Sequence, residues 1–533
     1  MEGVYRSALL VEPKIQCRQG ILCKTMQKPF WLVLLFVVIF AAGIRLDGAF
    51  SDLPYIFHPD EPRHIVIIQH IFKTGDLNPH FFNYPSMFLY VNSLAYIPYY
   101  FIEKLLGRFT TVDDIAEPVI LVMGTAFTPV PGTVILSRLV TLLFSLGSII
   151  LLFIAGKELT KIPLVGLLAA LMLALADSHI ASSSSITPDI FVLFWCLAAF
   201  LASILIMQQG KTWHYVLAGI AVGFAASSKY NGGLIMLTAV AAHFLRAGRS
   251  GITDKRLYLM FFLSGFGFIL ITPYSVLDFL NFGRALKSET MHYSTGHAGM
   301  EGHALTWYIK YLWQTEGVIA ALAIVQIVRG VYLRQKETLL TSTFAIVYIA
   351  FISHFVVRND RTLLPAIPFV VLLCSMLLVD LLRAGKAMML LKWTSVILII
   401  ITFALQLRYE SLILQEKKVV DSRITVPLWI KANLPKGAKI AVESYSPFVD
   451  PETFAVQGIM KMIDNPPQWY MDNNFNYLIF SRKMYHRFYE NPTNYAAEVA
   501  EYEQFFSNFS LVKIFNDGNF EVKIYEVASS AQT

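Results

Sequence analysis

The sequence is poor in charged residues and in cysteine, and each shortage excludes a class of protein. Only 15% of the 533 residues are charged, 56% are hydrophobic, and the mean hydropathy is +0.55. Soluble globular chains carry about 25% charged residues, so this composition excludes a soluble globular protein. The four cysteines precede the first hydrophobic run or lie inside apolar segments, which excludes a disulfide framework. The composition predicts a polytopic membrane protein.

The net charge of +6 does not indicate a nucleic-acid partner. The lysines and arginines lie mainly in short clusters between hydrophobic runs. Such clusters are typical of the cytoplasmic ends of membrane helices, as the positive-inside rule describes. We therefore expect no nucleic acid among the partners, and membrane lipids around the chain.

Long hydrophobic runs predict a transmembrane bundle of about eleven helices. If the N-terminus lies in the cytoplasm, every loop predicted to be cytoplasmic is basic. The first run is too long for a signal-peptide core and no cleavage site follows it. The predicted spans lie near residues 30–49, 134–156, 162–178, 189–207, 213–228, 233–245, 257–279, 314–332, 338–357, 362–381 and 392–409.

The predicted fold is mainly α and has three parts. Residues 1–29 form a cytoplasmic arm, residues 30–410 the membrane domain, and residues 411–533 a small soluble α/β domain outside the cytoplasm. The membrane domain includes a long first external loop, 47–133. The α/β domain is predicted from helices near 424–432 and 495–506 and strands near 439–443, 477–481, 511–515 and 520–527.

Two apolar stretches of the first loop affect the topology. We interpret 85–106 and 118–131 as interfacial or re-entrant segments, because a single extra crossing would place all the later basic loops outside. Two crossings there would leave the later orientation unchanged. The predicted orientation of the later helices is therefore firmer than the predicted number of helices.

An acidic pair, Asp60 and Glu61, opens the first external loop. Carboxylates so close to lipid are costly unless they have a function. The same residues fit a helix cap, with Pro62 as the first helical residue and Gly75 as the stop signal. A cap at the membrane surface is also a fixed carboxylate, so the two interpretations are compatible.

Polar residues stand at the outer ends of several other predicted helices. Arg138 opens the second span, Asp189 opens the fourth, and Arg361 precedes the tenth. Lys229 lies at the tip of a hairpin whose short first arm places this tip near the depth of a lipid phosphate. Each residue alone could be a membrane-edge anchor, but all of them map to the side of Asp60.

Histidines near the acidic pair raise the question of a metal ion. His58, His64 and His70 accompany Asp60 within one stretch of the loop. Their spacing matches no compact zinc pattern, so we predict no metal ligands, while a divalent cofactor stays open.

These motifs resemble those of the lipid-carrier-dependent glycosyltransferases of the GT-C superclass, close to the protein O-mannosyltransferases and the aminoarabinose transferases of lipid A. The resemblance covers residues 30–410 and depends on the order of short motifs. These are the Asp60-Glu61 pair, Asn83-Tyr84-Pro85, Ser137-Arg138-Leu139, Asp189, Lys229 with Tyr230, and Arg361-Thr362-Leu363-Leu364-Pro365.

The resemblance implies an activity and a role for each matched residue. Members of this group transfer a sugar from a polyprenyl or dolichyl phosphate to a hydroxyl of a protein, lipid or glycan on the outer side of the membrane. Asp60 would be the general base, and Glu61 and Asp189 further acidic residues that position donor or acceptor. The carrier phosphate and donor would be bound by Arg138, Lys229, Tyr230, Arg361, Tyr84 and His58.

The residue types suit this chemistry. A carboxylate can accept the proton of the attacking hydroxyl, and cations can stabilise the leaving phosphate. A single base on the face opposite the leaving group implies inversion at the sugar. The chief alternative is a transporter or flippase of lipid-linked sugars, which would keep its charges near the bilayer midplane. A second alternative is a membrane scaffold without catalytic activity.

Overall fold

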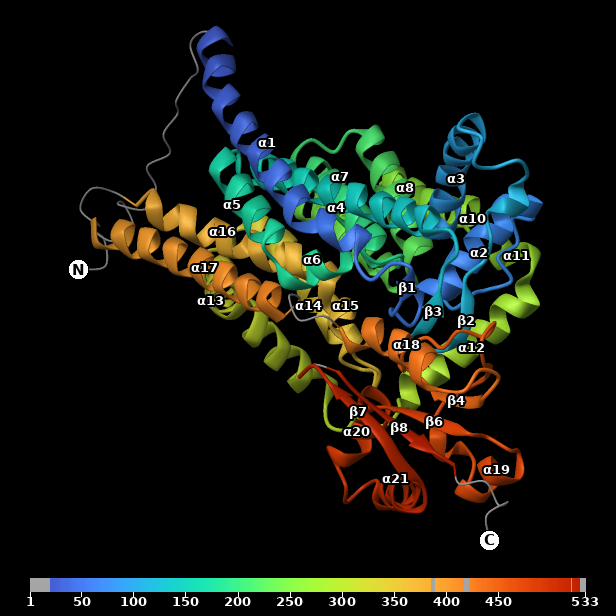
Figure 1. The fold of residues 1–533 in the computed structure, drawn as a ribbon. Helices are drawn as coiled ribbons and strands as arrows, with labels where there is room; N and C mark the ends of the chain where they lie inside the picture. The colour runs from blue at the N-terminus through green and yellow to red at the C-terminus, as the bar shows by residue number, and fades with distance from the viewer. Residues whose placement is uncertain (1–19, 385–388, 417–420, 519, 528–533) are drawn as a thin grey trace.

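The computed structural model has a long helical bundle with a small α/β domain beyond one end (Figure 1). The structure describes residues 20–384, 389–416, 421–518 and 520–527. Most of the predicted N-terminal arm, including Cys17, therefore lies outside the described residues.

Helices match all eleven predicted spans. Six described helical segments are long and apolar enough to cross a membrane, so the number of crossings stays a prediction. The bundle helices are α1 (Gly20–Phe50), α4 (Pro131–Thr160), α5 (Pro163–Ala174), α6 (Asp177–Ser182), α7 (Asp189–Gln208), α8 (Thr212–Ser228), α9 (Met236–Ala247), α10 (Lys255–Ile271), α13 (Ala304–Tyr332), α14 (Lys336–Ile352), α15 (Asp360–Leu363), α16 (Ile367–Leu382) and α17 (Met389–Glu416).

The bundle is packed around α16, which is buried on all sides. The outer helices α1 and α17 expose many apolar side chains, and this costs little in contact with lipid. Small residues permit a close approach between α4 and α5, where a Cβ on Gly156 would lie 2.8 Å from the Gly166 Cα. Composition and small-residue contacts together produce the packed bundle.

The first external loop contains two helices and a three-stranded sheet. Helix α2 (Glu61–Thr74) follows β1 (Tyr55–Ile56), and α3 (Met87–Leu105) covers the stretch predicted to be interfacial. Strands β2 (Val119–Val122) and β3 (Thr125–Phe127) form a hairpin, and β3 pairs with β1.

Part of the 118–131 segment contacts the C-terminal domain, and its predicted place at the membrane interface stays a prediction. The apolar side chains of Leu121 and Met123 pack against the core of the C-terminal domain rather than facing lipid. An apolar run in a loop can be buried by lipid or by another domain, and the sequence pattern is the same in both cases.

The C-terminal domain is a mixed sheet with helices packed against it. The strand order is β5-β4-β6-β8-β7, with β4 parallel to β5 and β6 and the other pairs antiparallel. Its elements are α18 (Ser422–Asn433), β4 (Lys439–Glu443), β5 (Ala455–Ile459), α19 (Pro467–Asp472), β6 (Tyr477–Ser481), α20 (Arg482–Tyr489), α21 (Ala496–Asn508), β7 (Ser510–Asn516) and β8 (Glu521–Glu526).

The structure adds elements to the predicted ones and moves a boundary. The predicted strands and helices of this domain are present, while β5, α19 and α20 were not predicted. Helix α17 extends to Glu416, past the predicted border at residue 410. Two further helices after α10, α11 (Tyr274–Leu277) and α12 (Phe279–Thr295), lie where the sequence predicted a helix end and a loop.

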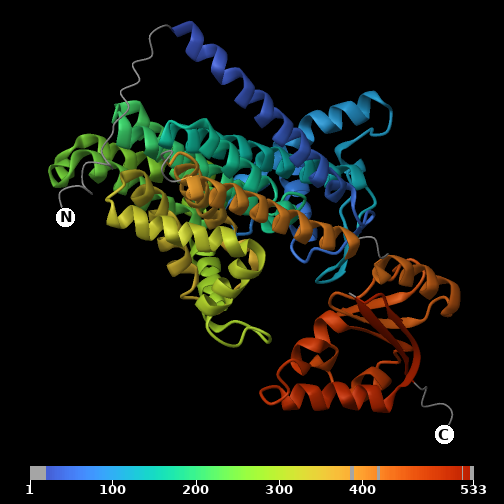
Figure 2. The ribbon, with the colours of Figure 1, turned by 90° about the vertical axis from the view of Figure 1, so that its left-hand side faces the viewer.

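The C-terminal domain lies beyond the end of the bundle that carries the first-loop sheet. Figure 2 shows α17 running along the outside of the bundle and leading to this domain. The Thr125 hydroxyl of β3 donates a hydrogen bond to the Ser446 carbonyl at 2.6 Å, which joins the two parts.

Candidate active site

The Asp60 side chain is not a helix cap. Asp60 occupies the N-cap position of α2 but accepts no capping hydrogen bond. Its Oδ2 instead lies 3.1 Å from Arg361 Nη1, so a loop carboxylate is joined to a residue 301 positions later. The helix itself ends as predicted, at Gly75 with a φ of 71°. The cap interpretation is therefore right for the backbone and wrong for the side chain.

The surroundings of Asp60 keep its carboxyl ionised. Burial disfavours the charge, but the Arg361 guanidinium outweighs it, and the pKa of Asp60 is lowered. Burial lowers the pKa of His58, which is therefore neutral at pH 7. The Asp60 backbone N–H donates to His58 Nδ1 at 3.1 Å, while His58 Nε2 faces the guanidinium of Arg361. A charged carboxylate and a neutral imidazole thus stand side by side.

Glu61 is fixed by Arg138 in a buried ion pair. Arg138 Nη2 and Nε donate to the two Glu61 oxygens at 2.8 and 3.2 Å. The Ile186 backbone N–H also donates to Glu61 Oε1 at 2.8 Å, and Arg138 Nη1 donates to the Ser51 carbonyl at 3.0 Å. Glu61 is 1% exposed and Arg138 5%. The pair has no exposed group for a ligand; it ties α2 to α4 directly behind Asp60.

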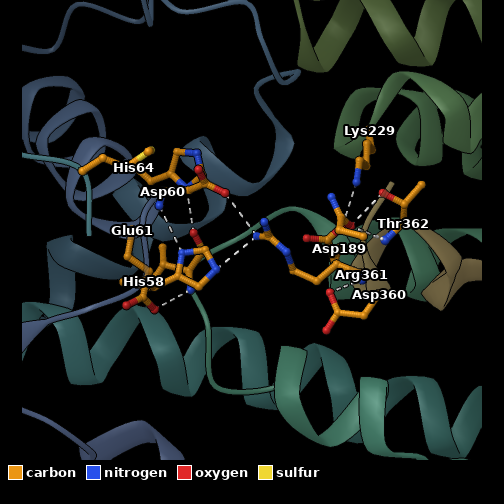
Figure 3. A network of polar contacts seen from close by, with 12 residues as sticks. His58, Asp60, Glu61, His64, Asp189, Lys229, Asp360, Arg361 and Thr362 are labelled. Carbon is orange, nitrogen blue, oxygen red and sulfur yellow. Dashed lines mark hydrogen bonds and ion pairs between the residues drawn. The ribbon is translucent and has the colours of Figure 1, made fainter. Parts of the chain in front are cut away.

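Arg361 lies between two acidic side chains (Figure 3). Its Nη1 lies 3.1 Å from Asp60 Oδ2 and 3.1 Å from His58 Nε2, and the guanidinium also interacts electrostatically with Asp189. Asp189, the first residue of α7, accepts a hydrogen bond from Lys229 Nζ at 2.8 Å. Residues from four parts of the chain therefore form one network of alternating charge.

A cavity of about 190 Å³ lies beside this network. Lys229 and Tyr84 line it, with the Lys229 Nζ 6.0 Å from the Tyr84 ring centroid. Tyr230 also lines it, and its hydroxyl donates to the Phe82 carbonyl at 2.8 Å. Apolar side chains also line it, namely Leu286, Phe351, Ile352, Phe355 and Val357. The cavity lining thus combines charged, polar and apolar side chains.

The histidines do not gather into a metal centre. His64 is buried and its Nδ1 lies 2.7 Å from the Ile186 carbonyl, while His70 is exposed on α2. Among the residues that the structure describes, no group of three potential metal ligands comes together.

Helix α12 contributes cavity residues that the sequence analysis missed. Tyr293 and Glu289 line the cavity, and Glu289 accepts a hydrogen bond from Asn83 Nδ2 at 2.7 Å. The sequence analysis predicts no membrane span over α12 and names none of its residues. Its amphipathic spacing was the available signal.

A family model matches about a third of the chain. Residues 123–284 match the model described as dolichyl-phosphate-mannose-protein mannosyltransferase. The matched segment contains Arg138, Asp189 and Lys229 and ends before Arg361. No curated protein matches the chain.

Solved structures share the fold over nearly the whole chain. ArnT from Cupriavidus metallidurans in the apo state is 14% identical with a TM-score of 0.53, over 92% of this chain and 98% of that one. The same protein bound to undecaprenyl phosphate is 13% identical with a TM-score of 0.54, over 95% of this chain and 98% of that one. A third structure is the archaeal oligosaccharyltransferase AglB from Archaeoglobus fulgidus, in complex with an inhibitory peptide and a dolichol-phosphate. It is 12% identical with a TM-score of 0.55, over 95% of this chain and 75% of that one.

The family match and the shared fold confirm the resemblance to the lipid-carrier-dependent glycosyltransferases of GT-C type.

Proposed function

We propose that this protein transfers a sugar from a polyprenyl or dolichyl phosphate to a hydroxyl acceptor at the extracytoplasmic face of the membrane. The observation that carries the proposal is the network in which Arg361 joins Asp60 to Asp189 and Lys229 beside a half-apolar cavity. In this orientation the N-terminus is cytoplasmic and the C-terminal domain extracytoplasmic, which the basic loops support.

Asp60 is the general base of the proposed reaction. Its ionised carboxylate takes the proton of the acceptor hydroxyl as the oxygen attacks the anomeric carbon, while the bond to the carrier phosphate breaks. Glu61 and Arg138 are positioning residues in this scheme, because their mutual pair leaves no atom free for the phosphate. A single base opposite the leaving group inverts the sugar.

Arg361 and Lys229 bind the carrier phosphate. Negative charge grows on this phosphate as the glycosidic bond breaks, so fixed cations stabilise the transition state more than the ground state. Asp189 holds the ammonium group of Lys229 in place, and His58, Tyr84 and Tyr230 shape the donor pocket. The apolar side chains that line the cavity suit the first isoprenoid units.

The transporter alternative has less support. A transporter is expected to carry its coupling charges near the midplane and to show repeated segments. Here Asp60, Asp189, Lys229 and Arg361 meet at helix ends, next to one external loop.

Lipids that copurify with the protein test the donor class. We expect mass spectrometry of the purified full-length protein to detect a polyprenyl or dolichyl phosphate or its glycoside, because the cavity joins cations to apolar side chains. An Arg361→Gln, Lys229→Met variant should lose this lipid while keeping bulk phospholipids. Equal amounts of the carrier in both preparations would contradict the assigned phosphate site.

The pH profile of transfer tests the role of Arg361. Because the pKa of Asp60 is below its ordinary 3.8, the acid limb of kcat/KM due to this residue should lie below about pH 4. In Arg361→Gln the guanidinium no longer offsets burial, so the pKa of Asp60 rises and the acid limb of kcat/KM should move to higher pH. An acid limb of kcat/KM at the same pH in both proteins would contradict the pairing of Asp60 with Arg361. Because the folded-state pKa of Asp60 is lowered, its ion pair with Arg361 stabilises the fold above pH 3.8. This stabilisation is lost as the pH falls through the lowered pKa.

A further inference from the structure

One hydrogen-bond acceptor of the cavity beside the candidate active site has no partner. The Asn231 side chain, two residues after Lys229, lines this cavity, and its Oδ1 is buried. Within the described part of the chain this oxygen accepts no hydrogen bond. A buried acceptor that lacks a hydrogen-bond donor costs free energy, so it needs an explanation. A ligand of the cavity with a suitable N–H or O–H group would supply the missing bond.

Neighbouring groups determine which atom of this amide is the oxygen. The hydroxyl of Tyr348, fully buried on α14, donates to the Thr362 carbonyl at 3.0 Å. A carbonyl can only accept, so the single hydroxyl proton is used there and the hydroxyl oxygen remains an acceptor. The Asn231 Nδ2 lies 3.0 Å from this oxygen and donates to it. The opposite amide orientation would set two acceptors against each other, so the atom without a partner is the oxygen.

The Asn231 amide is anchored next to Arg361. Thr362, whose carbonyl holds the Tyr348 hydroxyl, directly follows Arg361 and also lines the cavity (Figure 3). Arg361 in turn pairs with Asp60. A short series of hydrogen bonds and one peptide link therefore connects the unpaired oxygen to the proposed reaction centre.

A second acceptor of the cavity is the carboxylate of Glu289 on α12. One of its oxygens accepts the hydrogen bond from Asn83 Nδ2 at 2.7 Å. A carboxylate has about four lone-pair positions and no proton to donate, so further positions can serve a ligand. Asn83 directly precedes Tyr84, which lines the cavity and is within electrostatic reach of Asp60. Both acceptors are thus held by residues that adjoin the candidate active site.

The chemistry of these acceptors selects the part of a lipid-linked sugar that lies against them. A phosphate ester at neutral pH is itself an anionic acceptor, so a carboxylate repels it. An isoprenoid chain has no hydrogen-bond donor and would leave Asn231 Oδ1 without a partner. Each ring hydroxyl of a sugar can donate one hydrogen bond. Of the three parts of such a substrate, the sugar therefore fits these two side chains.

We propose that Asn231 and Glu289 are specificity-determining residues that accept hydrogen bonds from ring hydroxyls of the transferred sugar. This inference rests on the proposed function and deepens it, because it names the class of sugar as one with free ring hydroxyls at these acceptors. A deoxy sugar would leave a buried acceptor unpaired, and sites that bond a substrate hydroxyl reject analogues without it. After transfer the bare carrier lacks these contacts, so the two residues favour the sugar-loaded carrier over the spent one.

The affinities of loaded and bare carriers test the assignment. The purified full-length protein in detergent is titrated with dolichyl phosphate, dolichyl phosphate mannose and dolichyl phosphate glucose. The parent protein should bind at least one hexosyl probe about fivefold or more tightly than dolichyl phosphate. Asn231→Leu should weaken the binding of that hexosyl probe about fivefold to 100-fold, because a sugar hydroxyl loses its acceptor. The affinity of this variant for dolichyl phosphate should stay unchanged.

Glu289→Gln is a second variant that makes a milder change. The amide keeps one acceptor oxygen but loses the negative charge, and hydrogen bonds to charged groups are the stronger ones. This variant should weaken the same hexosyl probe by a smaller factor than Asn231→Leu and leave dolichyl phosphate binding unchanged.

Asn92→Leu is the matched control. Asn92 on α3 is fully buried, and its Oδ1 also lacks a hydrogen-bond partner among the described residues, but it does not line the cavity. The same change of side chain at this position should leave the affinity for all three probes unchanged. Equal losses in Asn92→Leu and Asn231→Leu would overturn the proposal.

The remaining outcomes separate this inference from the proposed function. Equal weakening of the hexosyl and bare probes by Asn231→Leu would overturn the sugar assignment, and so would unchanged binding of both. Equal affinity of the parent protein for all three probes would overturn it as well, while the carrier assignment would stand. If the parent protein binds none of the three probes, the proposed function is contradicted and this inference falls with it.

Discussion

Replacing Asp60 by Asn is expected to lower the rate of sugar transfer about 100-fold to 10,000-fold. The amide has nearly the same shape as the carboxylate but cannot take up the proton of the attacking hydroxyl. It also removes the negative charge that faces the sugar as positive charge develops there. Because the carrier phosphate is assigned to Arg361 and Lys229, donor binding should change little.

The measurement is transfer from a radiolabelled lipid-phosphate sugar, with donor binding determined on the same preparations. Asp76→Asn is the matched control, because Asp76 lies in the same external loop but is exposed and hydrogen-bonded only locally. It should leave transfer unchanged. Full activity of Asp60→Asn would remove this residue from the reaction, and loss of donor binding instead of transfer would assign it to the donor pocket.

Replacing Arg138 by Ala is expected to lower the free energy of unfolding by about 3–5 kcal/mol. The change leaves Glu61 buried with a charge whose guanidinium partner is gone, and only the Ile186 backbone N–H remains. Taking an unpaired carboxylate out of water is strongly unfavourable. Activity should fall as well, because α2 carries Asp60 at its N-terminal end and is tied to α4 through this pair.

Thermal unfolding of the detergent-solubilised protein measures this effect. Arg108→Ala is the control, since Arg108 pairs with Glu103 at 3.0 Å with its own side chain 65% exposed, and exposed pairs contribute little. Arg138→Met combined with Glu61→Leu should restore much of the lost stability, because two apolar side chains replace a buried ion pair without an unpaired charge. If the single and double variants unfold alike, the pair is not the source of the effect.

The sequence predicted the candidate site by the positions of its polar residues, but it did not predict which of them pair with one another. Asp60, Asp189, Lys229 and Arg361 stand out because polar groups at helix ends are rare in an apolar chain. Arg138 stands out for the same reason, and so it was assigned to the phosphate. Its actual partner, Glu61, lies 77 positions away, and no local pattern encodes that pairing.

The sequence by itself determined the membrane-embedded helical bundle, the acidic pair and the separate α/β domain. These follow from local properties: hydrophobic run length, helix-end signals and strand periodicity. Only the tertiary structure decided that Arg361 joins Asp60 to Asp189, that part of the 118–131 segment contacts the C-terminal domain, and that α12 lines the cavity. Such contacts join residues hundreds of positions apart, and whether an apolar or charged side chain faces lipid, ligand or another domain depends on packing that the local pattern does not record.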